Sequence, residues 1–370
     1  MGSSPRTSRY PRAPGAFLTA VMCGLGAFGL RADGPAAPAV PLDAVSGVIA
    51  AFRSHSVVAL GDGANHGDEE SHAFRLSLLR DPRFAGSVDD ILVEWGNSRH
   101  QGLIDRFVSG DDIAADVLRH VWQDTTEAGP IWDAPIYEAF FRAVREVNLA
   151  APPRRRIRVL LGGPPIDWDD VRTARDIHQW AGHGRALAID LVRREVLAKR
   201  RRVLIVYGAG HLWRTMPTGP GQSQADVASI VGALEAGDQG TRVFSIATPD
   251  ASVDWRRLQP DVDSWPAPTL TRLRGTRLGA APFRLYVPVP SAFRDRDPLR
   301  HLRMEDQFDA LLYLGRSAVR ASKLAPTLCT DLAYMEMRLR RMALVASIMP
   351  TGGQDAIDRL KRDCATVAPR

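Results

Sequence analysis

Residues 203–212 read Val-Leu-Ile-Val-Tyr-Gly-Ala-Gly-His-Leu, an apolar run that stops at glycine and is followed by a histidine. Continuous apolar runs of this length are typical of strands buried on both faces of a parallel sheet. The chain holds four more runs of the same kind, which we predict to be strands: Val57–Leu60, Ile91–Val93, Ile157–Leu161 and Val243–Ile246.

Amphipathic stretches lie between these runs. In the stretch 171–199, Ala186, Ile189, Val192 and Val196 recur at spacings of three and four, as expected for a helix that covers a sheet. Strands that alternate with helices predict an α/β fold, in which helices flank a mostly parallel sheet on both faces. We predict further helices at 69–79, 101–107, 136–147 and 225–234, additional C-terminal helices including 332–348, and edge strands at 283–287 and 310–314.

The composition is that of a globular chain. Of 370 residues, 45% are hydrophobic and 24% are charged, which excludes a disordered, collagenous or polytopic membrane protein. The net charge is +6, and only three of the 48 basic residues are lysines. The arginines are spread among acidic residues along the sequence, so we expect no nucleic-acid partner.

The N-terminal segment has the layout of a secretory signal peptide. Arg6, Arg9 and Arg12 precede the apolar run 16–30, and small residues follow at 34–39. We therefore expect a periplasmic or secreted protein with no integral membrane segment once the leader is removed. The predicted organisation is a leader at 1–39, an α/β domain at 40–320 and a C-terminal helical extension at 321–370.

Two cysteines follow the leader, Cys329 and Cys364. In an oxidising compartment they can pair and attach the last helix to the domain. Two free buried thiols are the alternative, and the sequence leaves both open. The chain contains no C-x-x-C motif, which excludes zinc-ribbon and thioredoxin-type sites.

Polar residues follow four of the predicted strands. Ligands of an open parallel sheet bind outside the carboxyl ends of the strands, so these side chains are expected at one edge. Imidazoles and carboxylates together can perform acid–base chemistry or bind a metal ion. The candidate residues are His66 after the first strand, Glu94 and Arg99 after the second, Asp167 after the third and His211 after the fourth.

The motif Gly-x-x-His occurs twice, at Gly63–His66 and Gly208–His211, each time directly after a predicted strand. A glycine there allows a tight turn that returns the imidazole over the sheet. A single loop histidine is usually only solvated, and the repetition is what favours a site. Other motifs are missing: the chain has no Walker A loop, no Gly-x-Ser-x-Gly elbow and no His-Glu-x-x-His.

Three stretches in this order resemble the erythromycin esterase branch of a clan that also holds ChaN-like haem-binding lipoproteins and TraB/Tiki-type proteins. They are Val57–Glu70, Ile91–Glu94 and Val203–Leu212. The resemblance implies that His66 is a general base or a metal ligand, that Glu94 is its carboxylate partner and that His211 is the second histidine of the site. The sequence departs from the esterases at Asp62, where they typically have glutamate.

These observations lead to three hypotheses. The first is an exported hydrolase of an ester or amide. In it, His66 activates water, Glu94 orients or charge-stabilises the His66 imidazole, and His211 with Arg99 stabilises the oxyanion. The second is a haem- or iron-binding protein of the ChaN-like type, without turnover. The third is a Tiki-like peptidase in which His66, Glu94 and His211 bind one divalent metal ion. A small molecule is the expected partner in the first case.

Overall fold

The computed structural model describes residues 36–62, 66–180, 183–217, 228–237, 240–249, 253–286, 299–315, 320–347 and 353–366. Most of the predicted leader, residues 1–35, lies outside the described residues, whereas Ala37 and Ala39 already contact the α/β body through Gly275 and Gln259. Among the described residues, no helix combines the length and the apolar character needed to cross a membrane.

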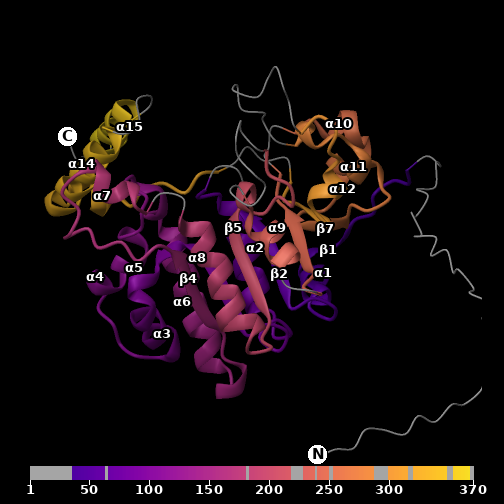
Figure 1. Ribbon diagram of the computed structural model, residues 1–370, viewed down its shortest axis with the longest axis horizontal. Helices are drawn as coiled ribbons and strands as arrows, with labels where there is room; N and C mark the ends of the chain where they lie inside the picture. Colours follow the sequence, from indigo (N-terminus) through magenta and orange to yellow (C-terminus); the bar gives the residue numbers. More distant parts are fainter. Residues whose placement is uncertain are drawn as a thin grey trace, which may run out of the picture. The chain divides into compact units, whose positions relative to one another are not determined.

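One mostly parallel sheet forms the centre of the described structure (Figure 1). Its order is β1-β7-β8-β6-β2-β5-β3-β4, and only β1–β7 and β7–β8 pair antiparallel. This confirms the predicted fold class. The strands are β1 Leu42–Asp43, β2 Val57–Asp62, β3 Asp90–Asn97, β4 Arg158–Gly163, β5 Val203–Gly208, β6 Val243–Ala247, β7 Thr269–Arg272 and β8 Ala310–Tyr313.

Helices cover both faces of the sheet, because alternate side chains of each strand point to opposite sides. Val58 and Leu60 of β2 belong to a core with α1, α2, α3 and α6. Val57 and Ala59 belong to a second core with α8, the following π-helix and α9. These helices are α1 Ala44–Ala51, α2 Glu69–Arg80, α3 Gln101–Ser109, α6 Pro135–Ala150, α8 His183–Leu191, the π-helix Val192–Leu197 and α9 Ile230–Gly237.

The remaining elements are short or lie near the C-terminus. The extension α13–α15 packs on the segment that follows β4 through a third apolar cluster, which includes Trp168, Met342 and Leu360 (Figure 1). The remaining helices are α4 Ala115–Leu118, α5 His120–Gln123, α7 Ala174–His178, α10 Trp255–Leu258, α11 Arg277–Ala280, α12 Met304–Gln307, α13 Pro326–Thr330, α14 Leu332–Ala346 and α15 Gly353–Ala365, with 3₁₀ turns at 98–100, 130–132, 153–155, 209–211, 260–264 and 283–285.

Three predictions of elements need correction. Residues 283–285 form a 3₁₀ turn after Pro282, not an edge strand, and Val287 lies outside the described residues. The strand β8 exists but is interior, because β7 and β1 extend the sheet beyond it. The helix expected over 171–199 is divided into α7, α8 and the π-helix. A capping box of Thr173 and Asp176 begins α7 at Ala174, and α7 ends at His178.

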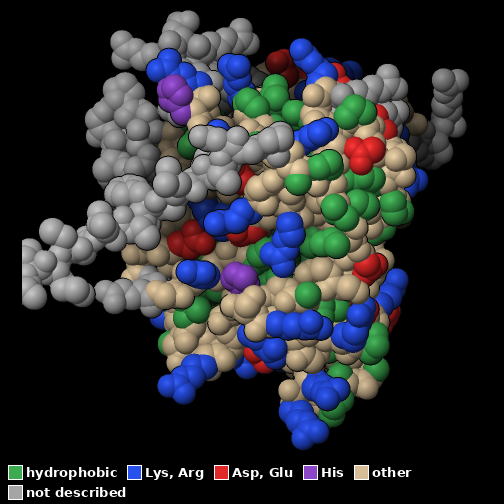
Figure 2. Space-filling view, turned by 90° about the vertical axis from the view of Figure 1, so that its right-hand side faces the viewer, with side chains coloured by type: hydrophobic (Ala, Val, Ile, Leu, Met, Phe, Trp, Pro, Cys, Tyr) green, Lys and Arg blue, Asp and Glu red, His purple; other side chains and the backbone are tan. Residues whose placement is uncertain are grey.

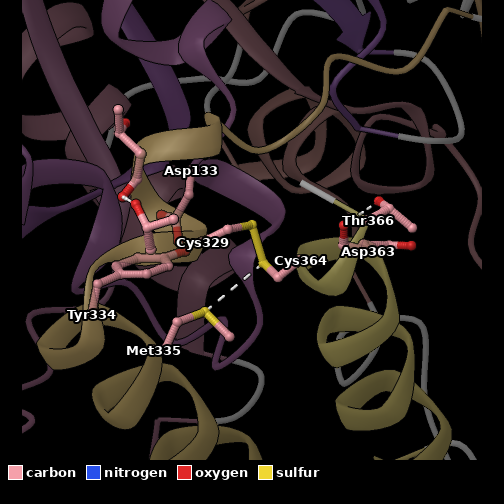
Figure 3. The surroundings of a disulfide bond; sticks show 9 residues. Asp133, Cys329, Tyr334, Met335, Asp363, Cys364 and Thr366 are labelled. Carbon is pink, nitrogen blue, oxygen red and sulfur yellow. Dashed lines mark hydrogen bonds between the residues drawn. A yellow bond between two sulfur atoms is a disulfide. The ribbon is translucent and has the colours of Figure 1, made fainter. Parts of the chain in front are cut away.

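Cys329 and Cys364 form a disulfide in the structure (Figure 3). It joins α13 to α15, and the Cys364 sulfur also lies 3.9 Å from the sulfur of Met335 on α14. The bond therefore ties together all three helices of the extension.

Candidate functional site

The site begins with two strand ends that are neighbours in the sheet. Asp62 at the end of β2 is paired in register with Gly208 at the end of β5. Strand β3, on the other side of β5, carries Glu94 where its register shifts between Val93 and Asn97. Such an irregularity re-aims a side chain. The carboxyl ends of β2, β5 and β3 thus bring Asp62, Gly208 and Glu94 to one place.

Glu94 is bound through both of its oxygens. Oε1 lies 3.2 Å from Nε2 of His211, and Oε2 accepts the backbone N–H of Gly208 at 2.7 Å. Burial would raise the pKa of Glu94, but the hydrogen bond and charge of His211, with the charge of His66, hold that pKa below its usual value. Glu94 is therefore a fixed anion that orients His211.

His66 has a different carboxylate behind it. Its Nδ1 lies 3.5 Å from Oδ2 of Asp62, and the guanidinium of Arg75 binds the other Asp62 oxygen. Burial would raise the pKa of Asp62, yet Arg75 and His66 lower it to about 2. Both Oδ2 and Nδ1 are buried and have no other partner in the described structure, so this long contact is the one hydrogen bond open to either atom there.

The two imidazole–carboxylate pairs meet at Gly208. A Cβ at this position would lie 3.0 Å from Cε1 of His66 and 3.5 Å from both Nε2 of His66 and Oε2 of Glu94. Any larger residue would force these side chains to move, which explains a glycine there. The structure therefore brings His66, Glu94 and His211 together. The expected pairing of Glu94 with His66 is wrong, because Asp62 is the carboxylate nearest to His66 and Glu94 is bound to His211.

The ionisation of His66 follows from these neighbours. Burial alone would lower the pKa of His66, but the hydrogen bond and charge of Asp62 and the charge of Glu94 raise it above its ordinary value. Asp62 faces Nδ1, so Nε2 is the nitrogen turned toward Gly208. A raised pKa makes this nitrogen a stronger proton acceptor.

Arg99 and Asp167 follow the neighbouring strands β3 and β4, and they bind each other at 2.6 Å. The Arg99 side chain is 53% exposed. Among the described residues, neither one forms a hydrogen bond or ion pair with His66, Glu94 or His211. Arg99 would have to leave Asp167 to reach an oxyanion, so its proposed role stays a prediction.

The segment 124–133 supplies two residues that the sequence did not point to. The ring of Trp132 packs edge-on against His66, with centroids 4.5 Å apart. Part of Glu127 is exposed to solvent, but the protein packed around its carboxyl group removes much of the water there. This desolvation and then the negative charge of Glu94 raise the pKa of Glu127. His66 and His211 also act on Glu127 electrostatically. No motif precedes either residue.

The C-terminal extension holds this segment in place. Arg338 binds Asp133 with both groups almost fully buried, and its guanidinium also reaches the backbone oxygen of Glu127. Arg341 binds Asp124 at 2.8 Å, and the Tyr334 hydroxyl donates to Asp133 (Figure 3). One wall of the site is thus fixed by a helix more than 200 residues later in the chain.

The site does not fit a resident metal ion. Within the described residues, no three His, Cys, Asp or Glu side chains have the spacing to bind one. Glu94 and Nε2 of His211, two of the ligands that the peptidase hypothesis needs, are engaged with each other. For haem, the aromatic ring beside His66 is that of Trp132, which is itself buried, and Asp62, Glu94 and Glu127 put negative charge around His66. A haem protein needs an apolar slot as well as an axial ligand.

Comparison with known proteins gives only distant structural matches. No family model matches the chain, and no curated protein matches it. One matching structure, from Bacillus cereus, has a TM-score of 0.49 and 13% identity, and covers 77% of this chain and 97% of its own. The type III effector HopBA1 matches with a TM-score of 0.35 and 16% identity, over 60% of this chain and 89% of its own.

A third match is ChaN of Campylobacter jejuni, described as binding haem cofacially. Its TM-score is 0.37 with 13% identity, and the match covers 56% of this chain and 87% of that protein.

Proposed function

We propose that this protein hydrolyses an ester or amide bond of a small molecule by general acid–base chemistry. The observation that carries the proposal is the meeting of two imidazole–carboxylate pairs, Asp62–His66 and Glu94–His211, at Gly208. A base and an acid on either side of one point are what the hydrolysis of a carbonyl compound requires.

In the proposed reaction, Nε2 of His66 takes a proton from water, and the water oxygen forms a bond to the carbonyl carbon. Asp62 stabilises the imidazolium that results, because it lies behind Nδ1. The bond to the leaving oxygen or nitrogen then breaks, and that atom takes a proton from His211. Glu94 holds His211 in position, and the two histidines exchange protons with solvent afterwards.

The proposal includes export from the cytoplasm. The Cys329–Cys364 disulfide supports this part, since disulfides persist in oxidising compartments. The signal-peptide layout of residues 1–39 supports it as well.

Hydrolysis of 4-nitrophenyl acetate by the purified chain and by Glu94→Gln tests the proposal. Glutamine keeps the shape but removes the charge that orients His211, so we expect a fall in kcat of about 10²-fold. Glu146→Gln, which changes an exposed glutamate on α6, is the matched control and should keep the wild-type rate. A wild-type chain without ester or anilide hydrolysis that binds haemin one to one, with a Soret band, would replace this proposal by the haem hypothesis.

A further inference from the structure

Arginines gather at the edge of the sheet opposite to the site. Five neighbouring parallel strands, in the order β6-β2-β5-β3-β4, begin at this amino edge. Their first residues are in register, since Val57 pairs with both Val203 and Val243, and Asp90 pairs with Val203 and Arg158. The turns before these strands are therefore side by side, about 5 Å apart from strand to strand.

Each of the five turns carries basic side chains. Seven arginines there are exposed and form no side-chain ion pair within the described residues: Arg53, Arg80, Arg154, Arg155, Arg156, Arg200 and Arg242. Four more basic residues are paired with local acids: Arg83 with Asp81, Arg201 with Asp90, Arg202 with Asp89 and Lys199 with Glu195. The acids Asp81, Asp89, Asp90 and Glu195 are thus already paired, whereas the seven arginines carry their charge without such a partner.

The side of the molecule at the right of Figure 1 carries basic side chains as well. Figure 2 shows one face of the molecule, and in its lower part blue Lys and Arg side chains outnumber red acidic ones. The amino ends of the strands lie at the bottom of Figure 1, and the two views share the vertical axis. Residues that are scattered in the sequence are therefore brought together by the fold.

Helix dipoles explain only part of the pattern. A cation near the last turn of a helix is stabilised by the negative end of the dipole, which accounts for single residues such as Arg80 on α2. The triplet Arg154–Arg156 comes four residues after the end of α6 at Ala150. It is therefore not in the last turn of that helix, where the dipole would stabilise a cation. Leu149, which is 56% exposed, lies five residues before Arg154. Within the described residues, the side chains of the triplet form no hydrogen bond or ion pair.

We infer that the amino edge binds the surface of a membrane that contains anionic phospholipid. The arginines line one edge across five strands, where an extended anionic surface can contact all of them, and Leu149 can enter the acyl boundary between the headgroups. Nucleic acid fits less well, because the basic residues lie on turns and, in the part of the chain that the structure describes, no exposed aromatic side chains are interleaved with them for base stacking. Binding in this orientation keeps the carboxyl edge, with His66 and Glu94, directed away from the lipid.

Vesicle co-sedimentation of the full chain tests the inference. The probe is vesicles of 30% phosphatidylglycerol in phosphatidylcholine, compared with phosphatidylcholine alone, at 0.1 M salt. The variant R154Q/R155Q/R156Q should lose on the order of 100-fold in partition coefficient, because each basic residue near an anionic surface contributes about fivefold. The matched control R359Q/K361Q/R362Q removes the same charge from the exposed face of α15 and should bind like wild type.

Binding should disappear in 1 M salt, where the screening length is about 3 Å. The inference is wrong if the triplet variant binds the vesicles like wild type. It is also wrong if the α15 control loses as much binding as the triplet variant, since the total charge of the protein would then determine binding and not the amino edge. It is also wrong if wild type prefers a DNA duplex to the vesicles at equal salt. None of these readouts uses catalysis, so the proposed hydrolase is tested separately.

Discussion

The parallel strands and the C-terminal extension differ in what keeps them in place. Strands β2 and β5 are buried along their whole length between two large apolar cores. The extension has a small apolar cluster, and it is attached by the disulfide and by the ion pairs Arg338–Asp133 and Arg341–Asp124. The sheet is therefore insensitive to any single polar contact, whereas the extension depends on a few of them.

The largest effect is expected from Arg338→Met. Removing one partner of a buried ion pair leaves Asp133 charged and without its cation, at a cost of about 3–5 kcal/mol in the free energy of unfolding. Denaturant unfolding measures this loss. Glu336→Gln, which changes an exposed glutamate on the same helix, is the control and should cost less than about 0.5 kcal/mol.

The double variant Arg338→Met/Asp133→Leu sharpens the same point. It removes both charges, so most of the lost stability should return. If the double variant is as unstable as Arg338→Met alone, then packing and not the buried charge is what holds α14 to the segment 124–133.

Reduction of the Cys329–Cys364 bond is expected to have the next largest effect. The bond closes a loop of 35 residues, for which loop entropy gives about 3–4 kcal/mol. Amide exchange in α14 and α15 should become about 10²–10³-fold faster, while the amides of β2 and β5 stay protected. Equal acceleration in the strands would show that the two regions unfold as one unit.

The predictability of the fold differs between these two regions for a physical reason. Apolar runs such as Val203–Tyr207 are visible in any single sequence, so the central strands and the α/β class follow directly. The short strands β1 and β7 have no such run, and residues 283–285, expected as part of a strand, form a turn that begins after Pro282. Long-range ion pairs leave no local pattern, so the attachment of α14 could not be predicted.

The residues of the site also differ in whether the sequence alone predicts them. Strand ends led to His66, Glu94 and His211, because the carboxyl edge of a parallel sheet collects them. The pairing of Glu94 with His211 depends on the register shift in β3, which no local sequence pattern encodes. Glu127 and Trp132 reach the site only because the extension holds the segment that carries them.

A smaller effect concerns pH. In the pH profile of kcat/KM, the acid limb is the pH range where the rate falls because His66 becomes protonated. The raised pKa of His66 places this limb above the ordinary imidazole value of about 6.5, since the neutral base is the active form. Asp62→Asn should move this limb to lower pH, because it removes the hydrogen bond and charge that favour the cation. A limb that stays in place would contradict the Asp62–His66 pairing.

The same groups link stability to pH with opposite signs. The folded pKa of His66 is raised, so its contribution to stability is complete below the unfolded value and is lost as pH rises through the folded pKa. The folded pKa of Glu94 is lowered, so its contribution is present above the unfolded value and is lost as pH falls through the folded pKa. Melting curves of His66→Asn and wild type at pH 5 and pH 9 should therefore differ more at pH 5.

The most direct test of the account is the rate of ester hydrolysis by His66→Asn, measured with the melting temperature on the same preparation. A general base typically contributes 10²–10⁴-fold, so kcat/KM should fall within that range while the melting temperature changes by only a few degrees. His55→Asn, a half-buried histidine at the opposite edge, should keep the wild-type rate. An unchanged rate in His66→Asn, with a large loss of stability, would show that this histidine is structural and would contradict the proposed function.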